Sequence, residues 1–279
     1  MNGILIVNKE ANMTSRDVVN KLTHILHTKH IGHTGTLDPI ATGVLVCVIG
    51  KYTKLCDDLT STYKEYIAEF KLGIKTDTYD YTGNIINTSN KKVANNEIKN
   101  IINSYVKTYN QEVPIYSSVK INGRKLYEYA RNNETVILPK REVTIKSIDI
   151  LSIKDNIIKI KCLVSKGTYI RSLINDIGIS LGTYATMISL CRTKQGIFDI
   201  SNSYTLEDIK NNNYKLLNLE DVLDLDIINV SDNLYKLINN GVSIDYTSNK
   251  EYLLFRYHNE DISLYKRIDN KYHMYIYLK

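Results

Sequence analysis

One continuous apolar run, Gly43 to Ile49, constrains the fold of this chain most, because such a run predicts a buried strand. The loop before it contains Gly32, Gly35 and a single carboxylate, Asp38. Pro39 disfavours helical geometry at Asp38, and the glycines allow tight turns or the close approach of another group. The sequence therefore predicts a loop that displays Asp38 at the end of a rigid strand.

A simpler interpretation of Asp38 is also open. An aspartate before a proline in a loop rich in glycine and threonine commonly accepts hydrogen bonds from nearby amides and only shapes a turn. The local residues alone do not decide between a turn former and a reactive carboxylate.

Periodicity elsewhere predicts a mixture of helices and strands. Thr14 with Asp17 is the spelling of a capping box, and the helix that it begins extends to about residue 26. Residues 64–72, 143–153 and 156–164 alternate apolar and polar side chains, which is the pattern of half-buried strands. Helical periodicity covers residues 94–105 and 168–181. From about residue 226 the composition shifts to short runs rich in Tyr, Leu and Ile, which predicts a small β-rich module at the C-terminal end.

The composition limits the class of protein. With 279 residues, 43% of them hydrophobic, the chain can bury one large core and a second, smaller one. It has no apolar run near the roughly 18 residues that a membrane helix requires, and no basic segment precedes its short apolar start. We therefore expect a cytoplasmic protein without a membrane partner. The net charge of +6 suits an RNA partner, but it also suits many proteins that bind no nucleic acid.

Four histidines at intervals of three residues raise the question of a metal site; they are His24, His27, His30 and His33. Steps of three rotate side chains by about 60° around a helix, so only neighbouring pairs can face one ion. No cysteine or carboxylate motif completes a ligand set, and no dinucleotide fingerprint, phosphate-binding loop or zinc-deaminase motif is present. The sequence therefore predicts neither a metal nor a cofactor.

A polar, basic and aromatic stretch lies at about residues 110–141. Asn122-Gly123 within it is the spelling of a tight hairpin turn, and a short helix bearing Tyr127 and Tyr129 follows. Basic side chains interleaved with tyrosines are what phosphate contacts and base stacking use. We interpret the stretch as an insertion that reaches towards a partner, with a merely solvated basic surface as the alternative.

The string GHTGTLDPIATGVL, Gly32 to Leu45, resembles the catalytic-loop signature of the tRNA pseudouridine synthase B family. Three further stretches resemble family motifs. They are Lys64-Glu65-Tyr66, the heptapeptide Gly167 to Leu173, and the basic stretch Pro114 to Arg131.

The resemblance implies roles for individual residues. Asp38 would be the catalytic residue, Tyr66 would pack on the target base and accept its C5 proton, and Arg171 would pair with Asp38. The residues that it implies for substrate binding are His33, which would help to splay the base out of its loop, and Tyr169, Lys120, Arg124 and Arg131.

The resemblance also implies a fold and a function. The fold would be α+β, with a mixed, mainly antiparallel central sheet in a catalytic domain of residues 1–225 and a PUA-like RNA-binding module in residues 226–279. The function would be the isomerisation of uridine-55 in the T loop of tRNA to pseudouridine by a monomer that uses no cofactor or metal. Two alternatives stay open: a catalytically silent tRNA-binding protein, and a guide-RNA-dependent pseudouridine synthase.

Overall fold

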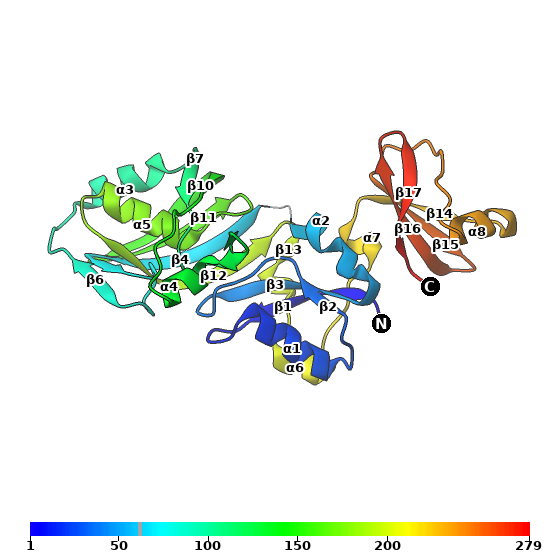
Figure 1. Cartoon of the computed structure of the whole chain (residues 1–279), viewed down its shortest axis with the longest axis horizontal. Coiled ribbons are helices and arrows are strands. Elements are labelled where there is room, and N and C mark those ends of the chain that lie inside the picture. The colour runs from blue at the N-terminus through cyan, green and yellow to red at the C-terminus, as the bar shows by residue number, and fades with distance from the viewer. Residues whose placement is uncertain (61–62) are drawn as a thin grey trace.

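The computed structural model describes residues 1–60 and 63–279, and its largest element is a long twisted sheet (Figure 1). Its strands are β1 (Gly3–Lys9), β2 (Ile31–His33), β3 (Thr42–Ile49), β4 (Lys64–Leu72), β7 (Thr108–Glu112), β10 (Lys140–Lys154), β11 (Ile157–Val164), β12 (Ala185–Gln195) and β13 (Phe198–Asp199). Among the described residues the strand order is β1-β3-β12-β4-β11-β10-β7, with β2 beside β3 and β13 beside β12. Strands β3 and β12 pair in parallel, and the other pairs are antiparallel. The predicted mixed, mainly antiparallel sheet is confirmed.

Helices pack on both faces of this sheet and fill the connections. They are α1 (Ser15–Ile25), η1 (Gly50–Leu55), α2 (Cys56–Thr60), α3 (Asn95–Ser104), α4 (Leu126–Arg131), α5 (Ile170–Ser180), η2 (Ile200–Asn202), α6 (Leu206–Lys210), α7 (Leu219–Val222) and α8 (Asp232–Asn239). The predicted capping box begins α1, because the Asp17 amide donates to Thr14 Oγ1 over 3.0 Å and the Thr14 amide donates to Asp17 Oδ2 over 2.8 Å. No helix in the described part of the chain is long and apolar enough to span a membrane.

Strands β1 and β3 are buried on both faces, which explains why their sequences are continuously apolar rather than alternating. Leu5, Leu45 and Cys47 face the core that α1, α3, α5 and α6 cover, whereas the neighbouring residues Ile4 and Val46 face a second core on the other side. The predicted buried strand is therefore confirmed, and it is a rigid base for the loop that precedes it.

A second, smaller sheet forms the C-terminal module at one end of the molecule (Figure 1). It consists of β14 (Leu225–Asn229), β15 (Tyr252–Tyr257), β16 (Glu260–Ile268) and β17 (Lys271–Tyr277). Side chains of this sheet, among them Leu254 and Leu264, share the second core with β1 and β3. The expectation of a small β-rich module is confirmed. The sequence patterns did not predict β14, which pairs in parallel with β15.

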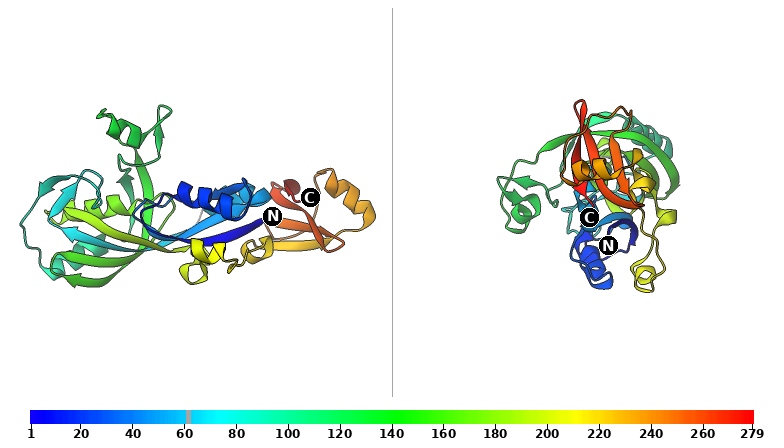
Figure 2. Two further views of the ribbon diagram at one scale, coloured as in Figure 1. Left: turned by 90° about the horizontal axis from the view of Figure 1, so that it is seen from below. Right: turned by 90° about the vertical axis from the view of Figure 1, so that its right-hand side faces the viewer.

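The predicted insertion stands away from the sheet on a stalk made by β7 and the start of β10 (Figure 2). It contains the hairpin β8 (Lys120–Ile121) and β9 (Arg124–Lys125), followed by α4. Asn122 and Gly123 both have positive φ, 51° and 82°, so the predicted tight turn is confirmed. Another hairpin, β5 (Ile74–Thr76) and β6 (Ile85–Thr88), encloses the turn of residues 77–84.

Candidate active site

The Asp38 loop connects β2 to β3 and is held by groups from several distant elements. Ser15 Oγ of α1 accepts from the Leu37 amide over 2.9 Å and also lies 3.3 Å from the Leu37 carbonyl. Lys9 Nζ donates to the carbonyl of Pro39 over 3.2 Å. Asp38 is therefore presented by a loop with a fixed backbone on each side of it.

Arg192 of β12 holds the two ends of the same loop, although it is only 1% exposed. Its Nη2 donates to the Gly35 carbonyl over 3.0 Å, and its Nε donates to the Val44 carbonyl over 2.7 Å. A Cβ on Gly43, which has φ +99°, would lie 2.2 Å from the Arg192 carbonyl oxygen. The glycine in the loop motif is therefore required by the close approach of β3 and β12.

The carboxylate of Asp38 makes a two-pronged ion pair with Arg171, the second residue of α5. Arg171 Nε lies 2.8 Å from Asp38 Oδ2, and Nη2 lies 3.0 Å from Oδ1. The Arg171 side chain is 4% exposed, whereas the Asp38 side chain is 32% exposed. Asp38 therefore keeps an open side towards solvent while a buried cation fixes its orientation.

The rest of the Arg171 guanidinium is bound by groups that the sequence patterns did not indicate. Nη1 donates to the Thr78 carbonyl over 3.1 Å, and Nη2 donates to the Tyr116 carbonyl over 3.0 Å. A buried second carboxylate, Asp80, lies 3.8 Å from Nε. Asp80 Oδ1 also accepts from the Thr82 amide over 3.0 Å. Every residue has a backbone carbonyl, so the sequence cannot show which carbonyls bind Arg171. Only the acidic turn of residues 77–84 could have suggested that this segment supports the guanidinium.

Tyr66 lies on the buried face of β4, directly paired with Arg192 of β12. Burial raises the pKa of its phenol, while the charge of the neighbouring Arg192 lowers it. Lys64, two residues earlier on the same face, has its pKa lowered to about 8 by burial and then by Arg192 and Lys166. Burial, Arg16 and Arg192 together lower the pKa of His33.

These residues line one cleft of about 1060 Å³, together with much of the insertion. Of the residues implied for the site, Asp38, Tyr66, Arg171, His33, Tyr169, Lys120 and Arg131 line it. Among the described residues of its lining, Asp38 is the one carboxylate, and the basic residues are Arg16, Lys64, Lys120, Lys125, Arg131, Arg141, Lys166, Arg171 and Arg192. The cleft is therefore basic enough to attract polyanions, and it presents a single carboxylate to them.

The resemblance also implies that Arg124 binds the substrate, but Arg124 does not line the cleft. Its guanidinium forms two hydrogen bonds to Glu134, of 2.8 and 2.9 Å, and lies 4.4 Å from the centre of the Tyr129 ring. Both side chains of the ion pair are about 42% exposed. Arg124 is thus occupied within the insertion, and its contact with RNA stays a prediction.

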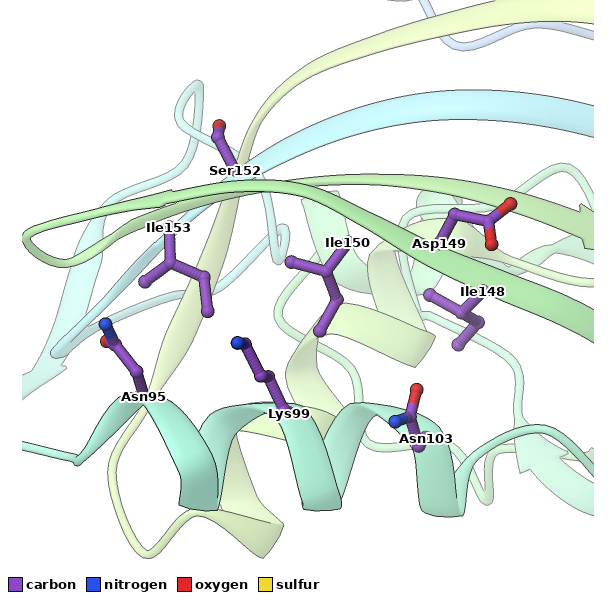
Figure 3. A pocket seen from close by; sticks show the side chains of 8 residues that line it. All are labelled: Asn95, Lys99, Asn103, Ile148, Asp149, Ile150, Ser152 and Ile153. Carbon is purple, nitrogen blue, oxygen red and sulfur yellow. The ribbon is translucent and has the colours of Figure 1, made fainter.

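A second hollow, of about 530 Å³, lies between α3 and β10 (Figure 3). Its lining combines isoleucines with a few polar side chains, including Lys99 and Asp149, and shares no residue with the cleft. It gathers no paired carboxylate and guanidinium, so the cleft is the candidate active site. Within residues 1–60 and 63–279 no group of three or more His, Cys, Asp or Glu side chains could hold a metal ion.

Comparisons with known proteins show the family to which the chain belongs. Residues 23–170 match the N-terminal domain of the TruB family of pseudouridylate synthases, and residues 171–230 match the tRNA pseudouridylate synthase B C-terminal domain. Curated relatives named tRNA pseudouridine synthase B come from several bacteria. The protein of Fusobacterium nucleatum is 47% identical over 72% of this chain and 70% of its own length. That of Clostridium kluyveri is 42% identical over 88% of this chain and 86% of its own length.

Solved structures support the fold. A Cbf5-Nop10-Gar1 complex contains a chain that matches with a TM-score of 0.69 at 22% identity, covering 99% of this chain and 84% of that one. An H/ACA RNP bound to a substrate RNA containing 2′-deoxyuridine matches with a TM-score of 0.67 at 21% identity and the same coverage. Sequence identities this low support a similarity of fold and nothing further.

The matching family models put the chain in the class of pseudouridine synthases, which are isomerases. Within that class, the chain belongs to the TruB family. The resemblance found in the sequence is thereby confirmed.

Proposed function

We propose that this protein isomerises uridine-55 in the T loop of tRNA to pseudouridine, with Asp38 as its one catalytic carboxylate and without a cofactor. The observation that carries the proposal is the ion pair between Asp38 and the buried Arg171 inside a basic cleft. Curated relatives that share 42 to 48% identity with this chain are named tRNA pseudouridine synthase B, which supports tRNA as the substrate.

The charges of the cleft support RNA as the molecule that enters it. Lys120, Lys125 and Arg131 reach the cleft from the insertion, Arg141 reaches it from β10, and Lys166 reaches it from the turn after β11. Side chains of this kind neutralise phosphates and supply affinity that falls as salt is added. A uridine inside a folded loop must be flipped out to reach Asp38, which costs a few kcal/mol. We propose that His33 and Tyr169, which line the same cleft, help to hold the loop open.

The reaction is a rearrangement in which the composition of the uridine does not change. The C1′–N1 bond breaks, the uracil rotates, and a C1′–C5 bond forms while the C5 proton leaves and N1 gains a proton. Asp38 would either attack C1′ and later be displaced by C5, or remove a proton from the sugar. Both routes require a carboxylate held in a fixed orientation, and the two hydrogen bonds from Arg171 hold it so.

Tyr66 is proposed to stack on the uracil and to accept its C5 proton. Burial raises the pKa of this phenol, so the group is neutral when the substrate binds. As an acceptor it would therefore pass its own proton on to water as it takes the proton from C5. The neighbouring Arg192 charge favours the release of the phenol's own proton, because it stabilises negative charge on the phenol oxygen.

The test compares wild-type protein with Asp38→Asn on a T-arm hairpin, with pseudouridine mapped at each position. Asn keeps the size of the side chain but removes its charge and its nucleophilic oxygen, so we expect undetectable product and RNA affinity within about tenfold of wild type. Asp149→Asn, at an exposed carboxylate of the second hollow, is the matched control and should keep full activity.

Five results would contradict the proposal. Substantial activity of Asp38→Asn would remove Asp38 from the mechanism, and product at another uridine would refute the assignment to position 55. A wild-type protein that binds tRNA but forms no pseudouridine would favour the silent binder. A requirement for an added guide RNA would favour a guide-dependent synthase, and loss of activity on treatment with EDTA would show that a metal takes part.

A further inference from the structure

Helix α5, which carries Arg171, begins without a side-chain cap of its own. Its N-cap residue is Tyr169, whose phenol makes no capping hydrogen bond. The amide N–H of Tyr169 is instead bound by Gln111 of β7, whose Oε1 accepts over 2.8 Å. Gln111 is only 2% exposed. A buried glutamine from a neighbouring strand therefore fixes the point at which this helix starts.

The other end of the Gln111 amide is fixed as well. Its Nε2 donates to the Tyr109 hydroxyl over 2.8 Å, and that hydroxyl donates to Asp176 Oδ2 over 3.2 Å. The Tyr109 hydroxyl has a single proton, which it gives to the carboxylate, so its oxygen is left to accept from the amide. These hydrogen bonds link Asp176 of α5, through Tyr109 and Gln111 of β7, to the Tyr169 amide at the start of α5. Strand β7 therefore holds the helix at two points.

The start of α5 is where the active site meets the insertion. Arg171 lies two residues after Tyr169, and its Nη2 binds both Asp38 Oδ1 and the Tyr116 carbonyl, each over 3.0 Å. Tyr116 belongs to the first turn of the insertion, and β7 is the strand that leads into it. Ser172 Oγ also donates to the Glu112 carbonyl over 2.9 Å. The end of β7 and the first turn of α5 are therefore bound together directly beside the catalytic pair.

We propose that Gln111 is a positioning residue for the isomerisation: its amide sets the start of α5 and thereby the orientation in which Arg171 holds Asp38. The inference rests on the proposed function, because it concerns the rate of that reaction. A displacement of about 1 Å in a group that orients the reacting atoms can lower a rate roughly a hundredfold. We therefore expect the residue to act on the chemical step and not on tRNA affinity, since its buried side chain is absent from the lining of the cleft.

The experiment uses single-turnover rates on a T-arm hairpin with enzyme in excess, together with the tRNA Kd and the midpoint of urea unfolding. Gln111→Met has a similar shape but neither hydrogen bond, and we expect a rate roughly ten- to a hundredfold below wild type with a Kd within about twofold. Gln111→Glu keeps an acceptor for the Tyr169 amide and should recover part of the lost rate. Tyr109→Phe keeps Gln111 and removes the hydroxyl that holds it, so it should lower the rate in the same direction.

A control variant separates positioning from stability. Tyr105→Phe removes the hydrogen bond of 2.8 Å between Tyr105 and Ser180 at the far end of the same helix, so it should lower stability but leave the rate unchanged. A double variant that combines Gln111→Met with Arg171→Lys tests whether Gln111 affects the rate through Arg171. If Gln111 acts through Arg171, Gln111→Met should slow the Arg171→Lys protein far less than it slows wild type.

The outcomes are distinct. A folded Gln111→Met variant with the wild-type rate would overturn the inference alone, as would equal rate losses in the wild-type and Arg171→Lys backgrounds. If Gln111→Met does not fold, an unchanged rate in Tyr109→Phe overturns it. A wild-type protein that forms no pseudouridine would overturn the proposed function and this inference with it.

Discussion

Asp176, in the middle of α5, should make the stability of the protein depend on pH in an unusual direction. Burial, with a smaller contribution from the nearby Glu112, raises the pKa of this carboxyl to about 6, although hydrogen bonds from Tyr109 and Asn175 act the other way. An aspartate in an unfolded chain has a pKa of about 3.9. The folded protein therefore holds a proton at Asp176 under conditions in which the unfolded chain has already released it.

This difference in bound protons determines whether the stability of the protein rises or falls with pH. A raised folded-state pKa gives stability that is fully present below about pH 4 and is lost as the pH rises through about 6. A shift of about two units corresponds to roughly 3 kcal/mol. Since Asp176 is partly exposed to water, we expect about 1 to 2 kcal/mol of this to appear. Asp176→Asn has no charge to bury but keeps an oxygen for Tyr109, so it should be more stable than wild type at pH 8 by about that amount.

The assay is urea unfolding of wild type and Asp176→Asn at intervals between pH 4.5 and 8. The difference in unfolding free energy should shrink as the pH falls, because contributions of the other groups cancel in the comparison. Asp199→Asn is the control: the amide of Ser201, then Lys194, lower the pKa of Asp199 to about 2, so its loss should destabilise the protein by an amount constant over this range. A constant difference for Asp176→Asn, or one that grows at low pH, would refute the reasoning.

Two further predictions concern the cleft. Tyr66→Phe keeps the stacking surface, worth about 1 to 3 kcal/mol per base, but lacks the hydroxyl, so the single-turnover rate should fall far more than RNA affinity; a wild-type rate would exclude the hydroxyl as a required acceptor. Replacing Lys120 and Arg131 by Ala should reduce the slope of log K against log salt by roughly 1.4 to 1.8 if each neutralises one phosphate. Arg124→Ala should change the slope by less than the roughly 0.7 to 0.9 expected for one neutralised phosphate, because Glu134 already binds that guanidinium; a change of that full size would contradict this distinction.

Local chemistry explains what could be predicted from the sequence. The capping box at Thr14, the Asn122-Gly123 turn and the buried strand Gly43 to Ile49 each depend on residues close together in the chain, and each is found in the structure. The pairing of Asp38 with Arg171 spans 133 positions, and no periodicity could have found it. It was predicted because both residues lie in motifs that resemble those of one family.

The features that were missed are those in which one partner is a backbone atom or a strand register. Arg192 binds the carbonyls of Gly35 and Val44, and only the parallel pairing of β12 with β3 brings it there. Nothing in the sequence around residue 192 indicates that pairing. The same holds for β14, whose parallel partner lies across a helix and a long connection, and for the core that the C-terminal module shares with β1.

Three cations from the described part of the chain lie close to the Asp38 loop. Two of them, Lys9 and Arg192, bind backbone carbonyls, and the third, Arg171, binds the carboxylate of Asp38. Lys9 and Arg192 direct their hydrogen bonds to backbone carbonyls, so they fix the loop without placing a second guanidinium or ammonium on the carboxylate. Burial lowers the pKa of Lys9 to about 8, against the pull of Asp38, and the ammonium therefore remains charged at neutral pH. Arg171 alone of the three binds Asp38 directly, and its remaining donors meet the carbonyls of Thr78 and Tyr116. If Asp38 reacts as we propose, a loop held by carbonyl contacts would keep its shape during the reaction, whereas a loop held by ion pairs to Asp38 would loosen once that charge is consumed.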